Sequence, residues 1–236
     1  MSTSGLHGKL LASIGPALVS GEIPAGTVLR AEELEARYGV SRTVVREAVR
    51  VLESMRLVSI RRRVGITVSP PEEWDVFAPE VIAWRLEGAD RPRQLHSLTV
   101  LRSAVEPVAA ALAARAATPK QAGELTGLAV ELAATARAGD LGAFLGHDIA
   151  FHRLVLAASG NEMFARLGDV VAAVLTGRTE HHLMPEHPAP AAVSAHIEVA
   201  EAIRCGEPER ARAAMRGIVD RALDELDALS TRPADR

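Results

Sequence analysis

The sequence predicts a mostly α-helical protein with an N-terminal winged helix-turn-helix, containing a small β wing, joined to an all-α antiparallel helical bundle. Two short helical patterns adjoin at residues 31–54, and two β-type segments follow them before a Pro-Pro pair. Beyond that pair the apolar residues keep a helical period to residue 230, with no strand pattern. We therefore expect domains at residues 1–71 and 91–230, connected by a helical linker at 72–90.

The predicted helix at residues 42–54 carries the most informative pattern. Ser41 occupies its N-cap position, and Gly39 is suited to end the preceding helix in a left-handed conformation. One apolar stripe follows the i, i+3, i+4, i+7 spacing: Val45, Ala48, Val49 and Leu52. The opposite side carries polar and basic residues: Arg42, Thr43, Arg46 and Arg50. Arginines near the start of the second of two short helices are typical of a recognition helix that enters the major groove of DNA.

A basic turn between two predicted strands, residues 57–60 and 66–69, extends this pattern. The turn contains Arg61, Arg62, Arg63 and Gly65, so the wing tip carries three arginines. Residues 41–63 hold seven arginines against two glutamates, although the whole chain has a net charge of −3. An isolated charge run is usually a solvated helix face. Here the basic residues lie on an otherwise acidic protein, and they coincide with the pattern of a DNA-binding fold. Together these two observations predict that the basic surface contacts phosphates.

The motif G-V-S-R-T-V-V-R-E-A-V-R-V-L-E, preceded by G-E-I-P-A-G-T-V-L, resembles the N-terminal domain of GntR-family bacterial regulators over about residues 6–69. The resemblance implies that the start of the recognition helix contacts phosphates and base edges, and that the wing enters the minor groove. Arg56 stands where many members have glycine, and Glu32 replaces an arginine that some relatives use. We assign the DNA-binding residues as Ser41, Arg42, Thr43, Arg46, Arg50, Arg61, Arg62, Arg63 and Gly65.

Length and composition narrow the class of protein. A chain of 236 residues is expected to form one or two domains. It has no uninterrupted apolar run near 18 residues and no signal-peptide pattern, so we expect a cytoplasmic protein without a membrane partner. The single cysteine, Cys205, cannot form an internal disulfide and is expected to be a small buried residue.

The bundle is predicted to contain six helices, separated by capping residues and glycines. Helix starts are indicated by Thr118-Pro119, Asp140, Asn161 and Glu207-Pro208, and Gly139, Gly160 and Gly206 indicate ends. The expected helices are residues 92–116, 119–138, 141–159, 162–182, 191–205 and 208–229. Both tryptophans lie in the linker, in W-D-V-F-A-P-E-V-I-A-W-R-L-E, which predicts that the linker docks on a folded surface.

Three bundle segments resemble the C-terminal ligand domain, called FCD, of the FadR-like branch of the same family. They are V-L-R-S-A-V-E-P-V-A-A-A-L-A-A-R, H-D-I-A-F-H-R-L-V-L-A-A-S-G-N and A-H-I-E-V-A-E-A-I-R-C-G. The resemblance implies a central pocket in which one aspartate and three histidines hold a divalent metal. Asp148, His152 and His196 match three of these positions, whereas the fourth falls on Ile218.

The spacing of Asp148 and His152 supports a metal site independently of the family. Residues at i and i+4 project from the same helix face, and a carboxylate with imidazoles suits Zn²⁺ and its first-row neighbours. Because Ile218 cannot ligate, a histidine at 181, 182 or 187 is an alternative fourth ligand. A second alternative is a polar pocket in which the same residues only hydrogen-bond to one another.

An effector site is expected in the same pocket. Arg102 matches an arginine that points toward an effector carboxylate in this domain, although an i, i+4 ion pair with Glu106 is the competing interpretation. Arg178 is a second candidate anchor, while Asn161 is expected to be an N-cap. The effector-binding residues are therefore predicted to be Arg102, Asp148, His152, Arg178 and His196.

These resemblances predict a homodimeric transcriptional repressor that a small carboxylate releases from a palindromic operator. One winged helix reads only a few base pairs, so specificity requires two half-sites. The linker is similar to that of regulators of sugar-acid catabolism, which makes gluconate or galactonate the expected kind of effector. Two alternatives are a helical metal-dependent enzyme fused to a DNA-binding domain and a regulator whose bundle only dimerises. The sequence shows no general base, nucleophile or phosphate loop outside the histidine cluster, which disfavours the enzyme.

Overall fold

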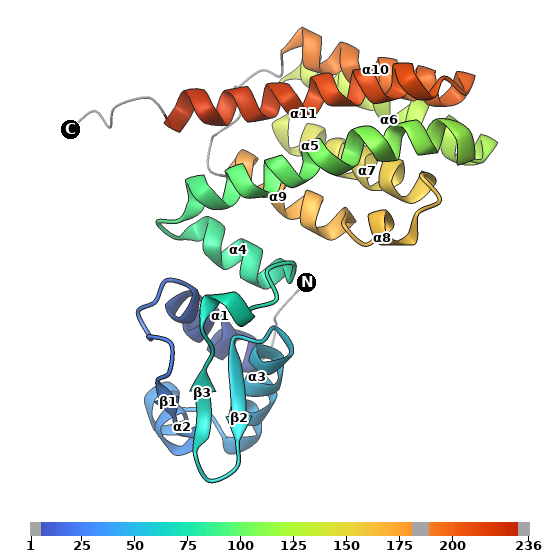
Figure 1. Cartoon of the computed structure of the whole chain (residues 1–236). Coiled ribbons are helices and arrows are strands. Elements are labelled where there is room, and N and C mark those ends of the chain that lie inside the picture. The colour runs from blue at the N-terminus through green and yellow to red at the C-terminus, as the bar shows by residue number, and fades with distance from the viewer. Residues whose placement is uncertain (1–5, 181–188, 231–236) are drawn as a thin grey trace. The chain divides into compact units, whose positions relative to one another are not determined.

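The computed structural model describes residues 6–180 and 189–230. The chain separates into two compact units, residues 1–91 and residues 92–236 (Figure 1). The segment at 72–90, which the sequence predicted as a separate linker, is included in the first unit.

The N-terminal unit is a winged helix. Its helices are α1 (Leu6–Val19), α2 (Ala31–Tyr38) and α3 (Arg42–Ser54), and its wing strands are β2 (Val58–Arg61) and β3 (Gly65–Val68). A third strand, β1 (Val28–Leu29), pairs antiparallel with β3 and completes a sheet of order β1-β3-β2 (Figure 1). The sequence analysis did not predict β1, because two residues are too few to produce a strand periodicity. The winged-helix prediction is confirmed.

Backbone conformations explain how α2 and α3 end. Gly39 adopts φ 63°, the left-handed conformation expected of a helix C-cap. Ser41 occupies the N-cap of α3 with an extended backbone, but its side chain makes no capping hydrogen bond. At the other end, Arg56 has φ 58° and its N–H donates to Glu53, while the N–H of Leu57 donates to Leu52. This is a Schellman turn, and its left-handed position is the one where many relatives have glycine.

The linker segment packs on the winged helix. It consists of a 3₁₀ turn (Pro71–Glu73) and α4 (Pro79–Glu87). The indole of Trp84 lies so close to α1 that a Cβ atom added to Gly15 would be 2.4 Å from its ring. The indole N–H of Trp74 donates to the carbonyl of Ser69 at 3.0 Å. Both tryptophans therefore dock on the N-terminal unit, as predicted.

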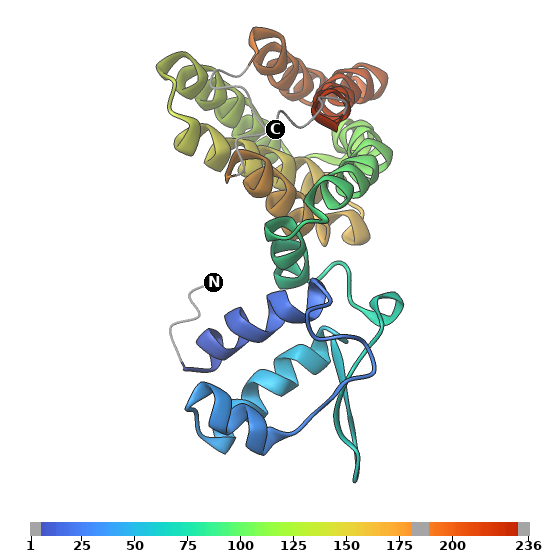
Figure 2. The same ribbon diagram turned by 90° about the vertical axis from the view of Figure 1, so that its left-hand side faces the viewer.

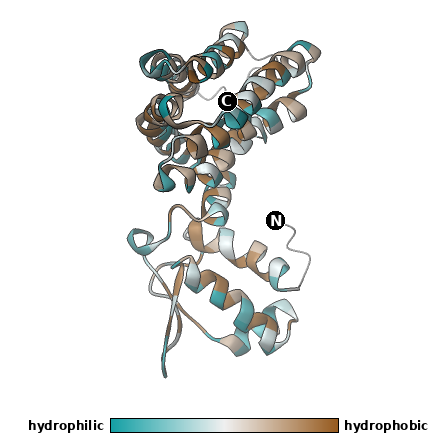
Figure 3. Ribbon diagram, turned by 90° about the vertical axis from the view of Figure 1, so that its right-hand side faces the viewer, coloured by the Kyte–Doolittle hydropathy of each residue, from teal (hydrophilic) through white to brown (hydrophobic). Residues whose placement is uncertain are grey.

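The second unit is a bundle of helices (Figures 1 and 2). Its core consists mostly of small and aliphatic side chains, with Phe144 and Phe151 as the buried aromatic residues. The apolar residues along its helices are brown in Figure 3. Alanines fill many of the close helix contacts, as their abundance in the sequence predicts. The helices are α5 (Arg91–Ala116), α6 (Pro119–Ala138), α7 (Leu141–Ala158), α8 (Glu162–Ala165), α9 (Gly168–Glu180), α10 (Pro190–Cys205) and α11 (Pro208–Ser230).

The single helix predicted at 162–182 is wrong, because the structure divides it into α8 and α9. Asn161 caps the first turn through its side-chain oxygen, and Leu167 closes a tight turn onto Phe164. Arg153 of α7 then contacts both the Gly168 carbonyl and the Asp169 carboxylate at the start of α9. These contacts separate the two helices, and they join residues too far apart in the chain for a periodicity to reveal. Positions 181, 182 and 187 lie outside the described residues.

The remaining helix ends agree with the capping pattern. Thr118 and Gln121 form a capping box at the start of α6, and Gly139 and Gly206 have positive φ at the ends of α6 and α10. Cys205, which was expected to be buried, is exposed on the last turn of α10. Its place at a helix end, next to the solvent-facing Glu201, explains the difference.

Within the described part of the chain, α5 is the one helix with the length and composition to cross a membrane. Half of its apolar window is buried inside the protein, and the window is interrupted by the buried Arg102 and Glu106. A core helix of a soluble protein has the same composition, so this feature is weak evidence for a membrane span.

Candidate functional site

The start of α3 presents an exposed polar surface. Ser41, Arg42, Thr43, Arg46 and Arg50 are all exposed, while the apolar stripe of the same helix is buried against the rest of the winged helix. Burial of that stripe determines which way the basic side points, so the arginines project into solvent together.

Ion pairs divide these arginines into two kinds. Arg50 contacts Glu47 of the same helix at 3.0 Å, and Arg42 lies 3.9 Å from Glu32. Arg46 has no ion-pair partner among the residues that the structure describes. Its guanidinium is therefore the one on this helix that a phosphate or a base edge can engage without displacing a carboxylate.

The wing arginines lie together at the end of the β2-β3 hairpin. Arg61 ends β2, Arg62 and Arg63 form the exposed turn, and Gly65 begins β3. Arg63 has φ 68° and Gly65 has φ 118°. A Cβ atom at Gly65 would lie 3.1 Å from the side chain of Val28 in β1, so glycine is favoured there by both conformation and space.

The bundle contains a pocket lined by side chains of α5, α7, α9, α10 and α11. All five residues predicted to bind the effector line it, and so does Ile218 at the fourth predicted metal position. Arg221, Glu225, Phe144, Leu175, Ala189, Ala192 and Ala222 complete the lining. The tertiary fold thus brings together candidates that are more than 90 residues apart in the chain.

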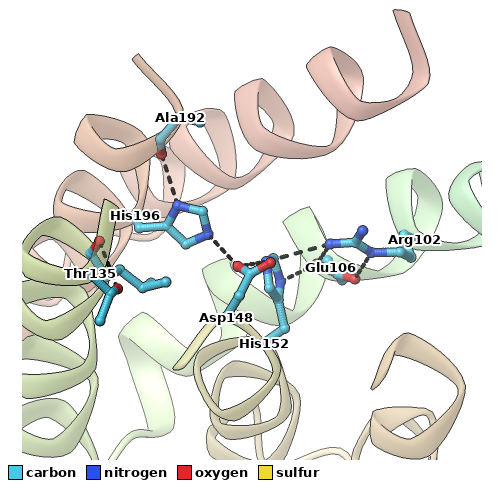
Figure 4. Close-up of polar contacts among 8 residues, drawn as sticks. Arg102, Glu106, Thr135, Asp148, His152, Ala192 and His196 are labelled. Atoms are coloured by element: carbon cyan, nitrogen blue, oxygen red, sulfur yellow. Dashed lines mark hydrogen bonds and ion pairs between the residues drawn. The ribbon is translucent and has the colours of Figure 1, made fainter. Parts of the chain in front are cut away.

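Asp148, His152 and His196 meet at one side of this pocket (Figure 4). Oδ1 of Asp148 lies 3.0 Å from Nε2 of His196 and 3.4 Å from Nε2 of His152. All three side chains are buried, and their potential ligand atoms lie within 4.8 Å of one another.

The other nitrogen of each imidazole is held by an acceptor. Nδ1 of His152 lies 2.6 Å from a carboxylate oxygen of Glu106, and Nδ1 of His196 donates to the carbonyl of Ala192 at 2.8 Å. A ring that donates from Nδ1 to such an acceptor leaves Nε2 as the nitrogen that can bind a metal ion. In the metal-free protein Asp148 accepts from these imidazoles, so a metal ion bound at Nε2 would take the place of the hydrogen that each ring directs at Asp148.

Glu106 is a site residue that the sequence analysis considered only as a partner of Arg102. That ion pair is present, with Arg102 Nε 2.6 Å from Glu106 Oε1, and both side chains are buried. Glu106 also contacts His152 through its second oxygen, so one carboxylate joins an arginine and a histidine. The i, i+4 spacing indicated the first contact, whereas the second depends on how α5 and α7 pack.

Electrostatic effects in this cluster oppose desolvation. Burial alone would raise the pKa of Glu106, but Arg102 and His152 outweigh it and lower that pKa to about 2. Burial would also raise the pKa of Asp148, yet hydrogen bonds with His152 and His196 hold it well below its usual range. Burial alone would lower the pKa of His152, but the carboxylates of Glu106 and Asp148 raise it to about 9.

The residues present fit a divalent metal ion with three protein ligands. With metal–ligand bonds of about 2.0–2.1 Å, neighbouring ligand atoms lie roughly 3 Å apart, close to the separations of 3.0 and 3.4 Å around Asp148. Ile218 leaves the fourth family position without a donor atom. The same distances also allow the polar alternative, in which the imidazoles and the carboxylate bind one another.

A second ion pair lies on the α9 and α11 side of the pocket. Nη2 of Arg178 contacts Oε2 of Glu225 at 2.6 Å, and Arg221 lies one turn before Glu225 on α11. Burial of its guanidinium lowers the pKa of Arg178, and the nearby positive charge of Arg102 lowers it further. Arg221 and Glu225 were missed by the sequence analysis. Their i, i+3 and i+7 spacing from Ile218 was the available signal.

Two family profiles cover most of the chain. Residues 8–68 match the profile described as bacterial regulatory proteins, gntR family, and residues 97–221 match the FCD domain. The second match alone spans more than half of the chain.

Individual relatives agree with these matches. The chain is 29% identical to the galactonate operon transcriptional repressor of Escherichia coli over 198 residues, which cover 83% of this chain and 86% of that protein. It is 29% identical to a probable D-xylose utilization operon transcriptional repressor of Paenarthrobacter nicotinovorans, over 84% of this chain and 78% of the relative. The solved structure of Streptococcus agalactiae GntR shares the fold, with a TM-score of 0.51 and 24% identity over 92% of this chain and 99% of that one. The chain is therefore a DNA-binding transcriptional regulator that belongs to the GntR family and has a C-terminal FCD domain.

Proposed function

We propose that this protein represses an operon for the catabolism of a sugar acid, and that a small carboxylate such as gluconate or galactonate releases it from its operator. Two relatives are named as repressors of the galactonate and D-xylose operons, and both align with most of this chain. The observation that carries the proposal is the buried pocket, in which arginines from different helices face a cluster of metal-ligand type.

The DNA-binding part of the proposal rests on the exposed residues of the winged helix. Arg42, Thr43 and Arg46 at the start of α3 read the major groove, with Ser41 and Arg50 beside them. The exposed wing residues Arg61, Arg62 and Arg63 lie along the minor groove, and Gly65 permits the sharp return of the chain. Such contacts combine phosphate affinity, which does not depend on sequence, with readout by a few side chains.

The metal part of the proposal assigns Asp148, His152 and His196 as ligands of a divalent ion such as Zn²⁺. A bound ion supplies a positive charge and open coordination positions for an acidic ligand. Glu106 orients His152 and Ala192 orients His196, so that both Nε2 atoms present their lone pairs. Arg102, whose Nη2 atom lies 3.4 Å from His152 Nε2, places a guanidinium beside this position for the effector carboxylate.

We further propose that the protein acts as a cytoplasmic homodimer on a palindromic operator. A single winged helix contacts too few base pairs for genomic specificity, and two copies related by a two-fold axis match two half-sites. Effector binding then needs to change operator affinity by about 1–3 kcal/mol for a useful switch.

Operator release tests the proposal. Arg102→Gln should leave operator binding unchanged in fluorescence anisotropy but abolish release by gluconate or galactonate, because the effector carboxylate loses its guanidinium partner. Arg115→Gln, an exposed arginine of the same helix, is the matched control and should respond as the parent protein does. If no sugar acid binds the parent protein in calorimetry, the bundle serves dimerisation alone and the effector proposal fails.

A further inference from the structure

Two groups of charged side chains face the pocket, and the metal-type cluster is only one of them. We call Arg102, Glu106, Asp148, His152 and His196 the acid-histidine cluster; it is built from α5, α7 and α10. We call Arg178, Arg221 and Glu225 the α11 cation group; it is built from α9 and α11. Among the described residues, no hydrogen bond or ion pair joins the two groups.

The α11 cation group exists because one face of α11 turns toward the pocket. Ile218, Arg221, Ala222 and Glu225 all line it, and their i, i+3, i+4, i+7 spacing is that of a single helix stripe. The first position of this stripe, Ile218, is the fourth predicted metal position, and its side chain cannot bind a metal. The next turn instead supplies a guanidinium and a carboxylate, so α11 contributes charge to the pocket without contributing a metal ligand.

Within the described part of the chain, three guanidinium groups in the pocket keep buried N–H donors without an acceptor. These atoms are Nη1 of Arg102, Nε of Arg178 and Nη1 of Arg221. The side chain of Arg178 is almost fully buried, with 4% of the residue exposed. A buried donor that has no partner is costly, and a charged donor more so, which makes each of these atoms a candidate contact for a ligand acceptor.

The formal charges of the two groups differ in their dependence on a metal. The α11 cation group has two guanidiniums and one carboxylate, a net charge of one positive, whether or not a metal is bound. The acid-histidine cluster has one guanidinium and two carboxylates, so without an ion its fixed charges attract no anionic group. With a divalent ion bound, its imidazoles are neutral ligands, and the ion, the guanidinium and the two carboxylates sum to one positive charge. With the ion in place, each group therefore attracts one anionic group of a ligand.

We propose that Arg178 and Arg221 form a second acid-binding position, and that the effector is a dicarboxylic sugar acid with one carboxylate at each group. This inference rests on the proposed function, because it assumes that the pocket is the effector site. It deepens that function by distinguishing an aldaric acid, which is acidic at both ends, from an aldonic acid such as gluconate. Without the ion, only Arg178 and Arg221 attract an anionic group, so a ligand gains nothing from a second carboxylate. The advantage of a dicarboxylic acid therefore depends on the metal, whereas the attraction of one carboxylate to Arg178 and Arg221 does not.

Calorimetry with a matched pair of ligands tests the proposal. Galactarate and galactonate share six carbons and their hydroxyl configuration, and differ in whether C6 is a carboxylate or an alcohol. In the presence of Zn²⁺, galactarate should bind the full-length protein about tenfold more tightly or better, the effect expected of one additional charge-assisted contact. After chelation of the metal, this preference should shrink to less than about threefold.

Variants on α11 identify the residue responsible. Arg221→Gln should remove the preference for galactarate while the protein still binds galactonate, and Arg221→Lys should keep part of it, because lysine retains the charge but not the planar fork. Arg216→Gln, an exposed arginine of the same helix, is the control and should change nothing. A thermal melt of each variant shows whether it is folded.

The outcomes separate this inference from the proposed function. If both acids bind equally in Zn²⁺, or if folded Arg221→Gln keeps the preference, the second acid-binding position is wrong while a carboxylate effector stands. If the preference for galactarate survives chelation unchanged, the proposal that one of its carboxylates binds at the metal-bound acid-histidine cluster is wrong. If neither acid binds and the parent protein is folded, the proposed function fails and takes this inference with it.

Discussion

The Nδ1 atom of His152 lies 2.6 Å from Oε2 of Glu106, and this contact joins α7 to α5 inside the bundle. The same carboxylate uses its other oxygen to contact Arg102. Glu106 therefore stands behind the predicted metal ligand and orients it, while it also holds the predicted effector anchor. A single buried acid connects the metal and effector parts of the proposed site.

Replacing Glu106 should weaken metal binding although it is not a ligand. Glu106→Gln removes the charge that holds the His152 ring in its tautomer, and loss of such a partner typically lowers metal affinity by about 10–100-fold. Competition titration with a Zn²⁺ chelator measures the affinity, and a thermal melt checks that the variant is folded. Glu124→Gln, on an exposed face of α6, is the matched control. Unchanged affinity in the Glu106 variant would show that His152 is oriented by other contacts or is not a ligand.

A histidine at position 218 should restore the ligand that this chain lacks. Ile218 lines the pocket, so Ile218→His adds an imidazole beside the three existing candidates. We expect the purified variant to retain more Zn²⁺ than the parent protein, measured by atomic emission after dialysis. Gly217→His places the same group one residue away, at an exposed position, and should retain no more than the parent protein. Equal retention in both variants would mean that position 218 does not face the metal site.

The stability of the metal-free protein should depend on pH through His152. Its pKa is raised from 6.5 to about 9, so the stabilisation by its protonated ring is complete below pH 6.5 and is lost as the pH rises through about 9. The melting temperature of chelator-treated protein should therefore fall across this interval. His152→Gln should flatten the profile there, and a wild-type slope in that variant would exclude His152 as the cause.

Glu106 should affect stability at acid pH. Its pKa is lowered from 4.5 to about 2, so its contribution to stability is present above pH 4.5 and is lost as the pH falls through about 2.

Arg46 should carry a measurable part of the specific affinity for the operator. Arg46→Ala is expected to weaken operator binding by about 1–3 kcal/mol without affecting dimerisation, because its guanidinium has no competing ion pair within the described residues. Gel-shift titration at fixed salt measures this loss. Arg137→Ala, an exposed arginine of the bundle, provides the control for a change in overall charge. Identical binding by both variants would remove Arg46 from the interface.

Gly15 should be indispensable for the docking of Trp84. A methyl group at this position meets the indole ring at 2.4 Å, and such overpacking costs about 1–3 kcal/mol. Gly15→Ala should therefore lower the melting temperature, despite the higher helix propensity of alanine. Gly123→Ala, in a helix with open space around it, should not lower the melting temperature. A second change, Trp84→Ala, should remove the penalty of Gly15→Ala; if it does not, the clash is not its origin.

The local features of this protein could be predicted from its sequence because they depend on neighbouring residues. The stripe that includes Val45 and Leu52 requires α3 to bury one side, and this burial leaves Arg46 exposed. Gly39 and Gly206 end helices because each adopts a left-handed conformation that other residues rarely adopt. The i, i+4 spacing of Asp148 and His152 likewise depends only on helix geometry.

The composition of the pocket was decided by tertiary packing. Glu106 contacts His152 across 46 positions of the chain, and Arg178 contacts Glu225 across 47. The division of α8 from α9 follows from contacts of Arg153 with residues 15 and 16 positions further along. No periodicity records such pairs, because side chains from different helices meet only after the hydrophobic core has set how the helices pack. The sequence by itself therefore determined the type of protein and most candidate residues, and the packing of the bundle decided which charges share a buried space and which N–H groups remain for a ligand.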